Sequence, residues 1–579
     1  MNKSMHGRLR GQAEALGGLL NKANARGSGM RLGKRMMTNI IVAGNNTGEQ
    51  TMKPTDIVNI NGGYNEMLST DDPMASIRKT FDDYAMMLDY RENIYRRNNG
   101  MASVNTVASP IKNLKILWNG IVGADCYRIK SIDQYEYLGG LTYTDSTHEQ
   151  QSKQHFLSNI KLKFSNQKNM ELMLSNRSYL GKTNGNTDRM LQGLDIDELT
   201  KGKLATINNT LTWLYRHGKN VFSYHADLNF LINSHLYRFN TRNASPLFAP
   251  HLRSEMKINR LEFAGSAQYV RRFAHDYFVR LALRHKLQTF STTIKGDSLG
   301  TNNPFIEKPL RFNDNGAELS LNKDQGKFRF GLGGVFHLFN IRSSQLLKLN
   351  VSPKIALAPL FNITYRASMM HYIELRLKST YQPMSQNTLF DGPYIADFKR
   401  MNFSQIDNIL AHTTELSAMQ AYGNFLKGIT LFNMIALSYN HNALTYDYSM
   451  LNPLISRAIS RNASGGKALT ASSMIEKKMI SIPLNIRLYG VISLARSPFF
   501  YQGMAQTSNS NALNLNLRLK TFYKRGFNGE LLAGAAWANS KSDMLNSRQN
   551  DYLLNAELGY IANKWQATIS AGQRWRKVN

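Results

Sequence analysis

The sequence has little of what holds together a disulfide scaffold or a bundle of membrane helices. Its 579 residues include one cysteine, Cys126, so no disulfide bond can form within the chain. No apolar run approaches the roughly 18 to 20 residues that a membrane-spanning helix needs. These absences exclude a small disulfide-stabilised protein and a helical membrane protein.

Acidic residues are also scarce. The chain has 40 Asp and Glu against 71 Lys and Arg, which gives a formal net charge of +31. Such an excess indicates nucleic-acid binding when the basic residues gather on one helix or one surface. Here they are dispersed over segments that we predict to be strands, so we expect no nucleic-acid partner. A lumen or a rim that meets phosphate-rich lipid fits this distribution better.

What the sequence has in abundance is alternation of apolar and polar residues. Between Leu204 and Ile232, apolar side chains occupy every second position on both sides of the polar turn His217 to Asn220. This pattern predicts two antiparallel strands joined by a tight turn. Each strand has about ten to twelve residues, which is close to what a tilted strand needs to cross a bilayer. The polar face therefore fits a lumen better than a solvent-exposed surface.

The same hairpin unit repeats from Ile111 to the end of the chain. We predict that 181–202 and 239–256, which are long and polar, are loops. Short turns at one end and long loops at the other are typical of outer-membrane barrels. We therefore predict an all-β protein, a large antiparallel transmembrane β-barrel of about 20 to 22 strands with long extracellular loops. The other predicted strand pairs are 156–164 with 170–174, 261–269 with 277–287, 317–321 with 328–338, 355–365 with 373–377, 416–425 with 429–439, 468–475 with 480–488, 513–519 with 531–537, and 554–560 with 565–575.

Two features interrupt the predicted strands. Gly331, Gly333 and Gly334 lie inside a strand pattern, where close packing or a β-bulge explains them better than a phosphate-binding loop does. Pro359 also lies inside a predicted strand, and proline is tolerated there only at an irregular point.

Residues 1–100 do not show this alternation. We expect a poorly defined N-terminal region, either a remnant of an internal plug or the first strands, followed by the transmembrane barrel over residues 101–579. A helix is predicted from Asp72 to Tyr95, because Asp72-Pro73 supplies a start signal before apolar residues in helical spacing. The first 35 residues contain no secretory signal, which an exported barrel requires, so we expect this sequence to be a fragment of a longer protein.

Catalytic, cofactor and metal signatures are weak. The 13 histidines are widely separated, without the short paired spacings of zinc sites, and turn or lumen positions explain them better. Ser, His and Asp residues are too common in the predicted loops to single out a serine nucleophile. We therefore predict no enzyme activity, no cofactor and no metal site.

The basic residues on the polar faces of the predicted strands are the candidate site. If the predicted register is right, their charges point into one enclosed lumen, where they would favour anions. Two alternatives remain open, namely that they pair with acidic groups on a plug or that they lie at the rim and contact lipid phosphates. The candidates are Lys161, Lys163, Arg280, Arg284, Arg376 and Arg518.

One passage gives the chain a family resemblance. In Leu349 to Tyr381, Ser352-Pro353-Lys354 precedes a strand, a turn and a second strand that ends in Tyr381-Gln382-Pro383. This passage, within the hairpin pattern of Ile111 to Trp575, resembles the barrel of TonB-dependent outer-membrane receptors of the type abundant in Bacteroidota. Phe398 to Asn402 stands where that family has a motif built on Asn-Pro and Leu, and the motif is not retained.

The resemblance implies an outer-membrane receptor and transporter of a Gram-negative cell for energy-coupled uptake of a scarce solute, such as a siderophore, a glycan or a peptide. Its implied partners are outer-membrane lipid and lipopolysaccharide, a TonB-type energy-coupling protein if a plug lies upstream, and a surface lipoprotein. No TonB box is recognisable, and Asn61-Gly62-Gly63 is too short to identify a plug. The alternative is therefore a non-transport outer-membrane barrel with a structural or adhesive role.

Overall fold

The computed structural model describes most of residues 9–578. Among the described residues, no helix is long and apolar enough to cross a membrane. The residues not described are 1–8, 19–21, 47–93, 137–141, 167–168, 192, 243–250, 274–275, 297–304, 307–309, 324–325, 343–350, 369, 384–393, 398–399, 425, 453–454, 480, 543–545, 563–565 and 579.

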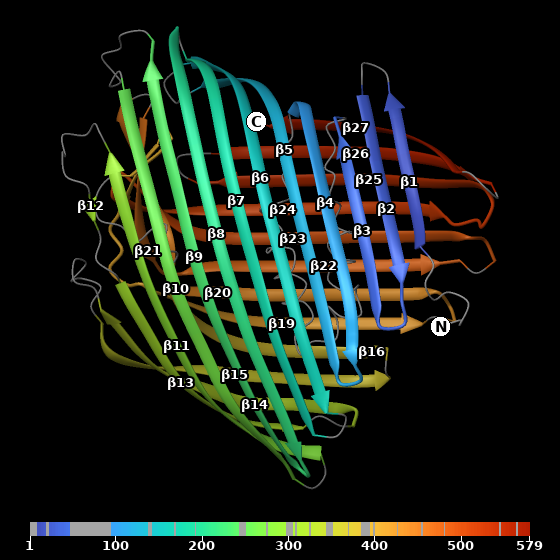
Figure 1. Cartoon of the computed structure of the whole chain (residues 1–579). Helices are drawn as coiled ribbons and strands as arrows, with labels where there is room; N and C mark the ends of the chain where they lie inside the picture. Colours follow the sequence, from blue (N-terminus) through green and yellow to red (C-terminus); the bar gives the residue numbers. More distant parts are fainter. Residues whose placement is uncertain are drawn as a thin grey trace.

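The described chain is one large sheet of 27 strand elements (Figure 1). This is more than the 20 to 22 strands expected, and four elements of two to nine residues, β12, β17, β18 and β21, account for most of the excess. The strands of the first half are β1 (Leu9–Gly18), β2 (Lys22–Leu32), β3 (Met36–Asn45), β4 (Ile94–Ile111), β5 (Leu114–Glu136), β6 (Thr142–Asn166), β7 (Met170–Leu191), β8 (Leu194–His217), β9 (Asn220–Thr241), β10 (His251–Arg272), β11 (Tyr277–Gly296), β12 (Phe305–Ile306) and β13 (Leu310–Lys323). Those of the second half are β14 (Phe328–Arg342), β15 (Val351–Ser368), β16 (His371–Pro383), β17 (Tyr394–Asp397), β18 (Arg400–Ser404), β19 (Leu410–Asn424), β20 (Ile429–Asn452), β21 (Ile455–Ala463), β22 (Gly466–Lys478), β23 (Leu484–Tyr501), β24 (Met504–Thr521), β25 (Gly526–Lys541), β26 (Asn546–Ile561) and β27 (Gln566–Val578).

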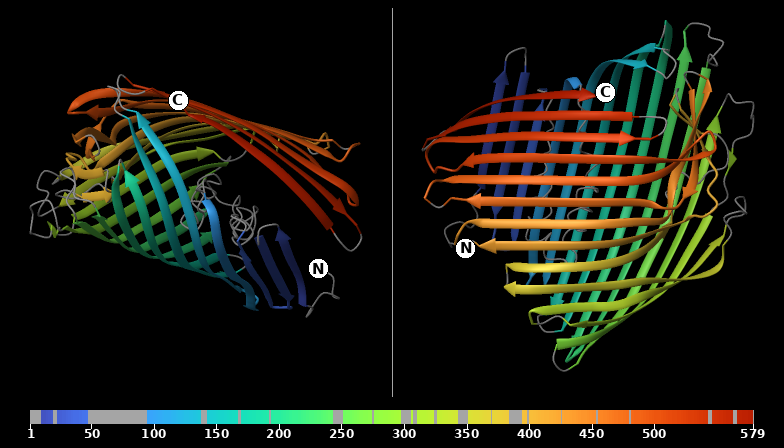
Figure 2. Two further views of the ribbon diagram at one scale, coloured as in Figure 1. Left: turned by 90° about the horizontal axis from the view of Figure 1, so that it is seen from above. Right: turned by 180° about the vertical axis from the view of Figure 1, so that it is seen from behind.

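The long strands pair antiparallel with their neighbours in chain order, and the sheet curls into the wall of a wide barrel (Figure 2). The short elements are bypassed, because β11 pairs with β13, β16 with β19, and β20 with β22. Within the described residues, β1 pairs only with β2 and β27 only with β26. The large antiparallel sheet predicted from the alternation is confirmed.

The two ends of the barrel wall differ. At one end, which we call the short-turn end, strands are joined by short connections such as Gly218-Lys219 between β8 and β9. The opposite end, which we call the long-loop end, carries the connections 46–93, 297–309 and 384–409. This is the asymmetry that the sequence predicted.

The segment 181–202, which we expected to be a loop, is strand instead. It forms the end of β7 and the start of β8, which meet at a turn of two residues. The second expected loop, 239–256, is also largely strand. It begins within β9 and ends within β10, and only its residues 243–250 lie outside the described residues. The 25 residues of β6 would span about 80 Å at about 3.3 Å per residue, far more than the roughly 25 Å apolar band of a barrel. The strands therefore continue well beyond any membrane, where alternation is not required.

The N-terminal 100 residues contribute three strands, β1 to β3, and the start of β4. The helix predicted from Asp72 lies outside the described residues, except that its last two residues, Ile94 and Tyr95, begin β4. The division into 1–100 and 101–579 stays a proposal.

The irregular residues of the sequence have local explanations. A Cβ atom on Gly333 would clash with the carbonyl oxygen of Leu319, so the glycine permits close packing of β14 against β13, as predicted. The pairing of β15 with β16 stops at Leu360. Pro359 directly precedes Leu360 in β15 and therefore lies outside this pairing. Its missing N–H group therefore breaks no hydrogen bond to β16.

Candidate functional site: the inner face of the barrel

The two faces of the wall follow from strict alternation along each strand. In β11, Leu281 and Leu283 are 46% and 61% exposed on the outer face, and Arg280 and Arg284 alternate with them on the inner face. The same alternation places Lys161 and Lys163 on the inner face of their strand, because Ile160 is exposed on its outer face. It likewise places Arg518 on the inner face, because Leu517 is exposed on the outer face. Arg376 alternates with the exposed Ile373 and Leu375. All six candidate residues therefore lie on the inner face.

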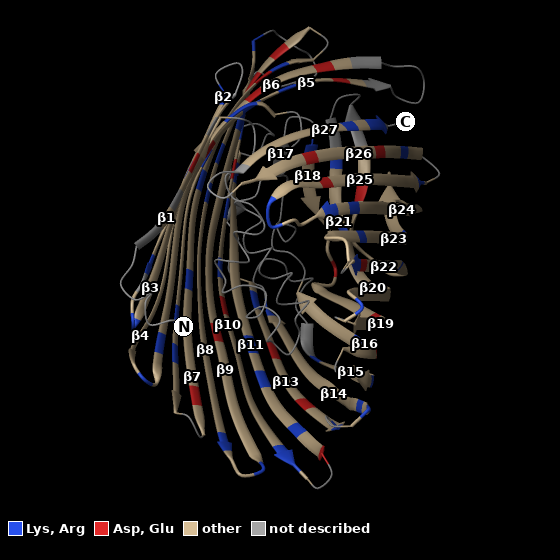
Figure 3. Ribbon diagram, turned by 90° about the vertical axis from the view of Figure 1, so that its right-hand side faces the viewer, with Lys and Arg blue, Asp and Glu red and all other residues tan. Residues whose placement is uncertain are grey.

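The six residues also share one level of the barrel. Each lies within about seven residues of the short-turn end of its strand, because β6 and β24 end there and β11 and β16 begin there. They come from different parts of the wall, and Figure 3 shows basic and acidic residues spread over many strands. They therefore form a zone around the lumen and do not converge on one point.

Carboxylates of the wall itself pair with most of these cations. Glu318, whose side chain is 2% exposed, contacts Arg284 directly and lies 3.7 Å from Arg280. Glu530 lies 2.6 Å from Arg518 and 2.8 Å from Lys520. In both clusters one carboxylate contacts two cations. The Glu318 cluster therefore keeps a net positive charge, whereas Glu476 and Glu557 also act electrostatically on Arg518 and offset the charge of the Glu530 cluster.

A third cluster of this kind was not predicted. Asp551 contacts Arg574 and lies 3.0 Å from Arg576, both on β27. The sequence offered a signal, because Arg574 and Arg576 alternate with Trp575 on an apolar-polar strand. One carboxylate with two cations is thus a repeated arrangement on this face.

The remaining candidates differ in their surroundings. Lys163 lies 2.8 Å from Glu171, and Arg376 lies 3.0 Å from Glu374 on its own strand. Within the described part of the chain, Lys161 has no carboxylate within 4.0 Å. Pairing with wall carboxylates was not among the alternatives that the sequence suggested.

Near the long-loop end, the inner face carries a buried network around Arg189. The guanidinium lies 2.6 Å from both Asp145 and Glu198, and the hydroxyl of Tyr237 donates a hydrogen bond of 2.9 Å to Glu198. Burial alone would lower the pKa of Arg189, but Glu198 and Asp145 together raise it above its ordinary value. Sequence reasoning missed this network because Arg189 and Glu198 lie in 181–202, which was predicted to be a loop.

At the same end, the inner face carries packed clusters of buried apolar and aromatic side chains. One cluster combines Phe290, Phe312 and Phe339 with Ile406 and Ile409. A second lies beside the Arg189 network and consists of Leu191, Ile196, Tyr237, Phe239 and Leu252. Toward the long loops the inner face is therefore covered by packed apolar and aromatic side chains, whereas toward the short turns it carries the more exposed basic residues.

A row of stacked rings crosses the wall where β15 and β16 separate. The ring of Tyr381 stacks on His412 at 4.0 Å, and His412 stacks on His441 at 4.1 Å. Tyr381 also packs against Phe339 of the inner cluster, at 5.7 Å between ring centroids. Among the described residues, no three His, Cys, Asp or Glu side chains are grouped so that they could hold a metal ion.

Comparison with known proteins rests on structure. The amino-acid sequence matches no protein-family model, and no curated protein matches it. The fold is similar to the ferric yersiniabactin uptake receptor FyuA from Yersinia pestis, with a TM-score of 0.51 and 10% identity over 99% of this chain and 80% of that chain. It is similar to the siderophore receptor PiuA from Acinetobacter baumannii, with a TM-score of 0.52 and 8% identity over 98% and 81%. It is also similar to BauA, the ferric preacinetobactin receptor from Acinetobacter baumannii, with a TM-score of 0.50 and 9% identity over 98% and 79%.

All three of these proteins are receptors and none is described as an enzyme. Each aligns with 98 or 99% of this chain. The chain therefore has the fold of the large receptor barrels of the outer membrane, as the sequence resemblance predicted.

Proposed function

We propose that the chain is an outer-membrane receptor barrel that takes up a scarce solute with energy supplied from the inner membrane. The single observation that carries the proposal is the fold, because FyuA, PiuA and BauA are receptors and align with nearly all of the described wall. The barrel has no catalytic role. Its partners are a TonB-type energy-coupling protein, lipopolysaccharide and a surface lipoprotein.

The inner face supports an anionic solute. Its basic end holds Lys161, which has no carboxylate partner among the described residues, and Arg280 and Arg284, which share the single carboxylate of Glu318. Charge focused inside an enclosed wall of low dielectric attracts ions of the opposite sign. Ferric complexes of catecholate chelators carry negative charge and are therefore the first probes to use.

Uptake by living cells tests the proposal. Cells with and without the gene would receive ⁵⁵Fe bound to catecholate or hydroxamate chelators, and growth would be compared on limiting iron, oligosaccharides and peptides. We expect accumulation or growth on at least one nutrient to require the gene and to stop when a protonophore removes the energy supply. Equal uptake and growth with and without the gene across the whole panel would contradict a transport function.

A further inference from the structure

The outer face changes abruptly from leucine to polar and charged residues at one level of the wall. Across β19 to β23 the register aligns Leu416, Leu437, Leu469 and Leu494 in one row. The next outward-facing row toward the long-loop end contains Thr414, Tyr439, Lys467, Arg496, Asn509 and Lys541. Because exposed leucines mark the surface that faces hydrocarbon, this boundary is where lipid headgroups would begin.

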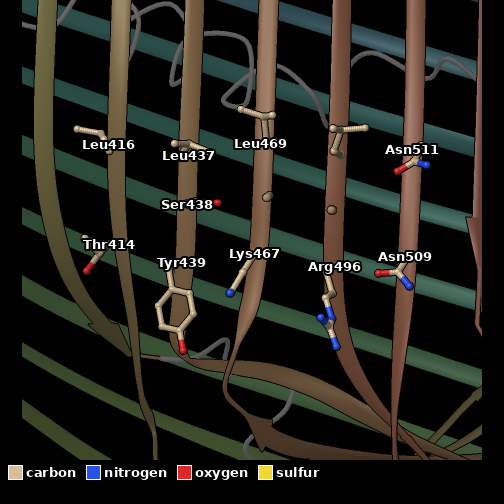
Figure 4. A pocket seen from close by; sticks show the side chains of 13 residues that line it. Thr414, Leu416, Leu437, Ser438, Tyr439, Lys467, Leu469, Arg496, Asn509 and Asn511 are labelled. Carbon is tan, nitrogen blue, oxygen red and sulfur yellow. The ribbon is translucent and has the colours of Figure 1, made fainter.

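A pocket of about 520 Å³ lies at this boundary (Figure 4). The leucines line one side of it, and Lys467 and Arg496 line the other, from neighbouring strands. The ammonium group of Lys467 lies 5.9 Å from the ring centroid of Tyr439. The pocket therefore joins an apolar surface to two adjacent cations.

The same boundary recurs on the other wall of the barrel. Phe156, Leu180 and Ile232 line the apolar side of a larger pocket, of about 1200 Å³, together with Val42 and Val122. Its polar side carries Lys182, Lys203 and Lys257 together with Glu255, which lies 3.4 Å from Arg253. The register aligns the three lysines in one row with Gln154 and Ser234. Two separate regions of the outer face thus have the same arrangement.

The cations of these two rows differ from those of the inner face in their partners. Lys182 lies directly opposite Lys203, and Lys467 lies directly opposite Arg496. All four side chains are exposed, and within the described residues none has a carboxylate within 4.0 Å. Like charges directly opposite one another across a strand pair are destabilising. An anion from outside the chain that binds between the two cations of a pair would therefore reduce their repulsion.

We propose that these two outer-face rows bind phosphate-bearing lipids of the membrane leaflet at the long-loop end. The acyl chains lie against the apolar row, and a phosphate group is held between the two cations of each pair. A lipid contacts the apolar row with its acyl chains and the cations with its phosphate, whereas a soluble anion would contact only the cations. The proposal rests on the outer-membrane location proposed above, and not on solute uptake.

Lipid binding to the purified full chain tests this assignment. Native mass spectrometry in detergent would follow titration with diphosphoryl lipid A, for the unmodified chain and for the double variants K467Q/R496Q and K182Q/K203Q. Each cation near a lipid phosphate contributes about 1 kcal/mol, so losing two should weaken binding at that site about 30-fold. Retained heat-modifiable mobility on gels would show that the variants are folded.

The matched control is K477Q. Lys477 lies on the same strand and the same outer face as Lys467 but at the short-turn end, where its ammonium group donates a 2.6 Å hydrogen bond to the carbonyl of Lys427. We expect K477Q to bind lipid A as the unmodified chain does. Unchanged binding in both folded double variants would overturn the proposal, and so would release of the lipid by millimolar inorganic phosphate. Uptake is measured separately in cells, so a failed transport test leaves this result interpretable.

Discussion

At the scale of single residues, burial decides what an ion pair contributes. The Arg189 side chain is 17% exposed, and its partners Asp145 and Glu198 are 1% and 7% exposed. Arg189→Met would remove the cation that both buried carboxylates contact, and breaking a buried ion pair typically costs about 3 to 5 kcal/mol. We expect the free energy of unfolding to fall by this amount. Urea unfolding of the refolded protein in detergent, monitored by tryptophan fluorescence, would measure it.

Arg242 offers the matched control for that variant. It belongs to the same end of the wall and lies 2.7 Å from Asp197, but the two side chains are 60% and 39% exposed. Exposed ion pairs contribute little because water screens them, so Arg242→Met should barely move the unfolding midpoint. Equal losses in the two variants would show that the buried network has no special role.

At the scale of the strand, the face on which a residue lies determines how strongly a charged substitution destabilises the barrel. Leu515 and Asn516 are neighbours in β24, but Leu515 is 40% exposed among the outer leucines and Asn516 faces the lumen. Leu515→Arg should therefore cost about 2 to 4 kcal/mol near the bilayer midplane. Asn516→Arg should cost much less, because its new charge enters a polar lumen.

Heat-modifiable gel mobility over a urea series in lipid vesicles would measure both variants. Asn516→Arg also serves as the control, since it adds the same side chain at the next position. Similar destabilisation by the two changes would show that the assigned faces of β24 are wrong.

The strands also show what the sequence could predict. Where a strand separates hydrocarbon from a polar lumen, one face must be apolar, and this alternation located the hairpins at the short-turn end, such as His217 to Asn220. Beyond the apolar band both faces are polar, so no pattern distinguishes strand from loop, and 181–202 was assigned wrongly. Alternation likewise placed all six basic candidates on the inner face, but it could not reveal Glu318 as the shared partner of Arg280 and Arg284, because that contact joins β11 to β13 across the sheet.

At the scale of the whole molecule, positive charge is distributed between two surfaces with different partners. On the inner face, wall carboxylates such as Glu318, Glu530 and Asp551 each compensate part of the charge of two cations. On the outer face, the rows that contain Lys467 and Lys182 have no such compensation among the described residues. The net charge of +31 therefore does not translate into one strongly basic lumen.

Ion selectivity follows from this distribution. Since Arg280 and Arg284 share the single carboxylate of Glu318 and Lys161 has no carboxylate partner among the described residues, we expect the purified chain in planar bilayers to prefer anions modestly at low salt. The preference should fade toward 1 M salt, where the screening length shortens to about 3 Å. Lys161→Glu should reduce it most, because Lys161 has no carboxylate partner among the described residues, so the change replaces an unneutralised positive charge with a negative one. The control Lys477→Glu adds the same charge on the outer face and should leave selectivity unchanged, whereas cation selectivity of the unmodified chain at low salt would refute a basic lumen.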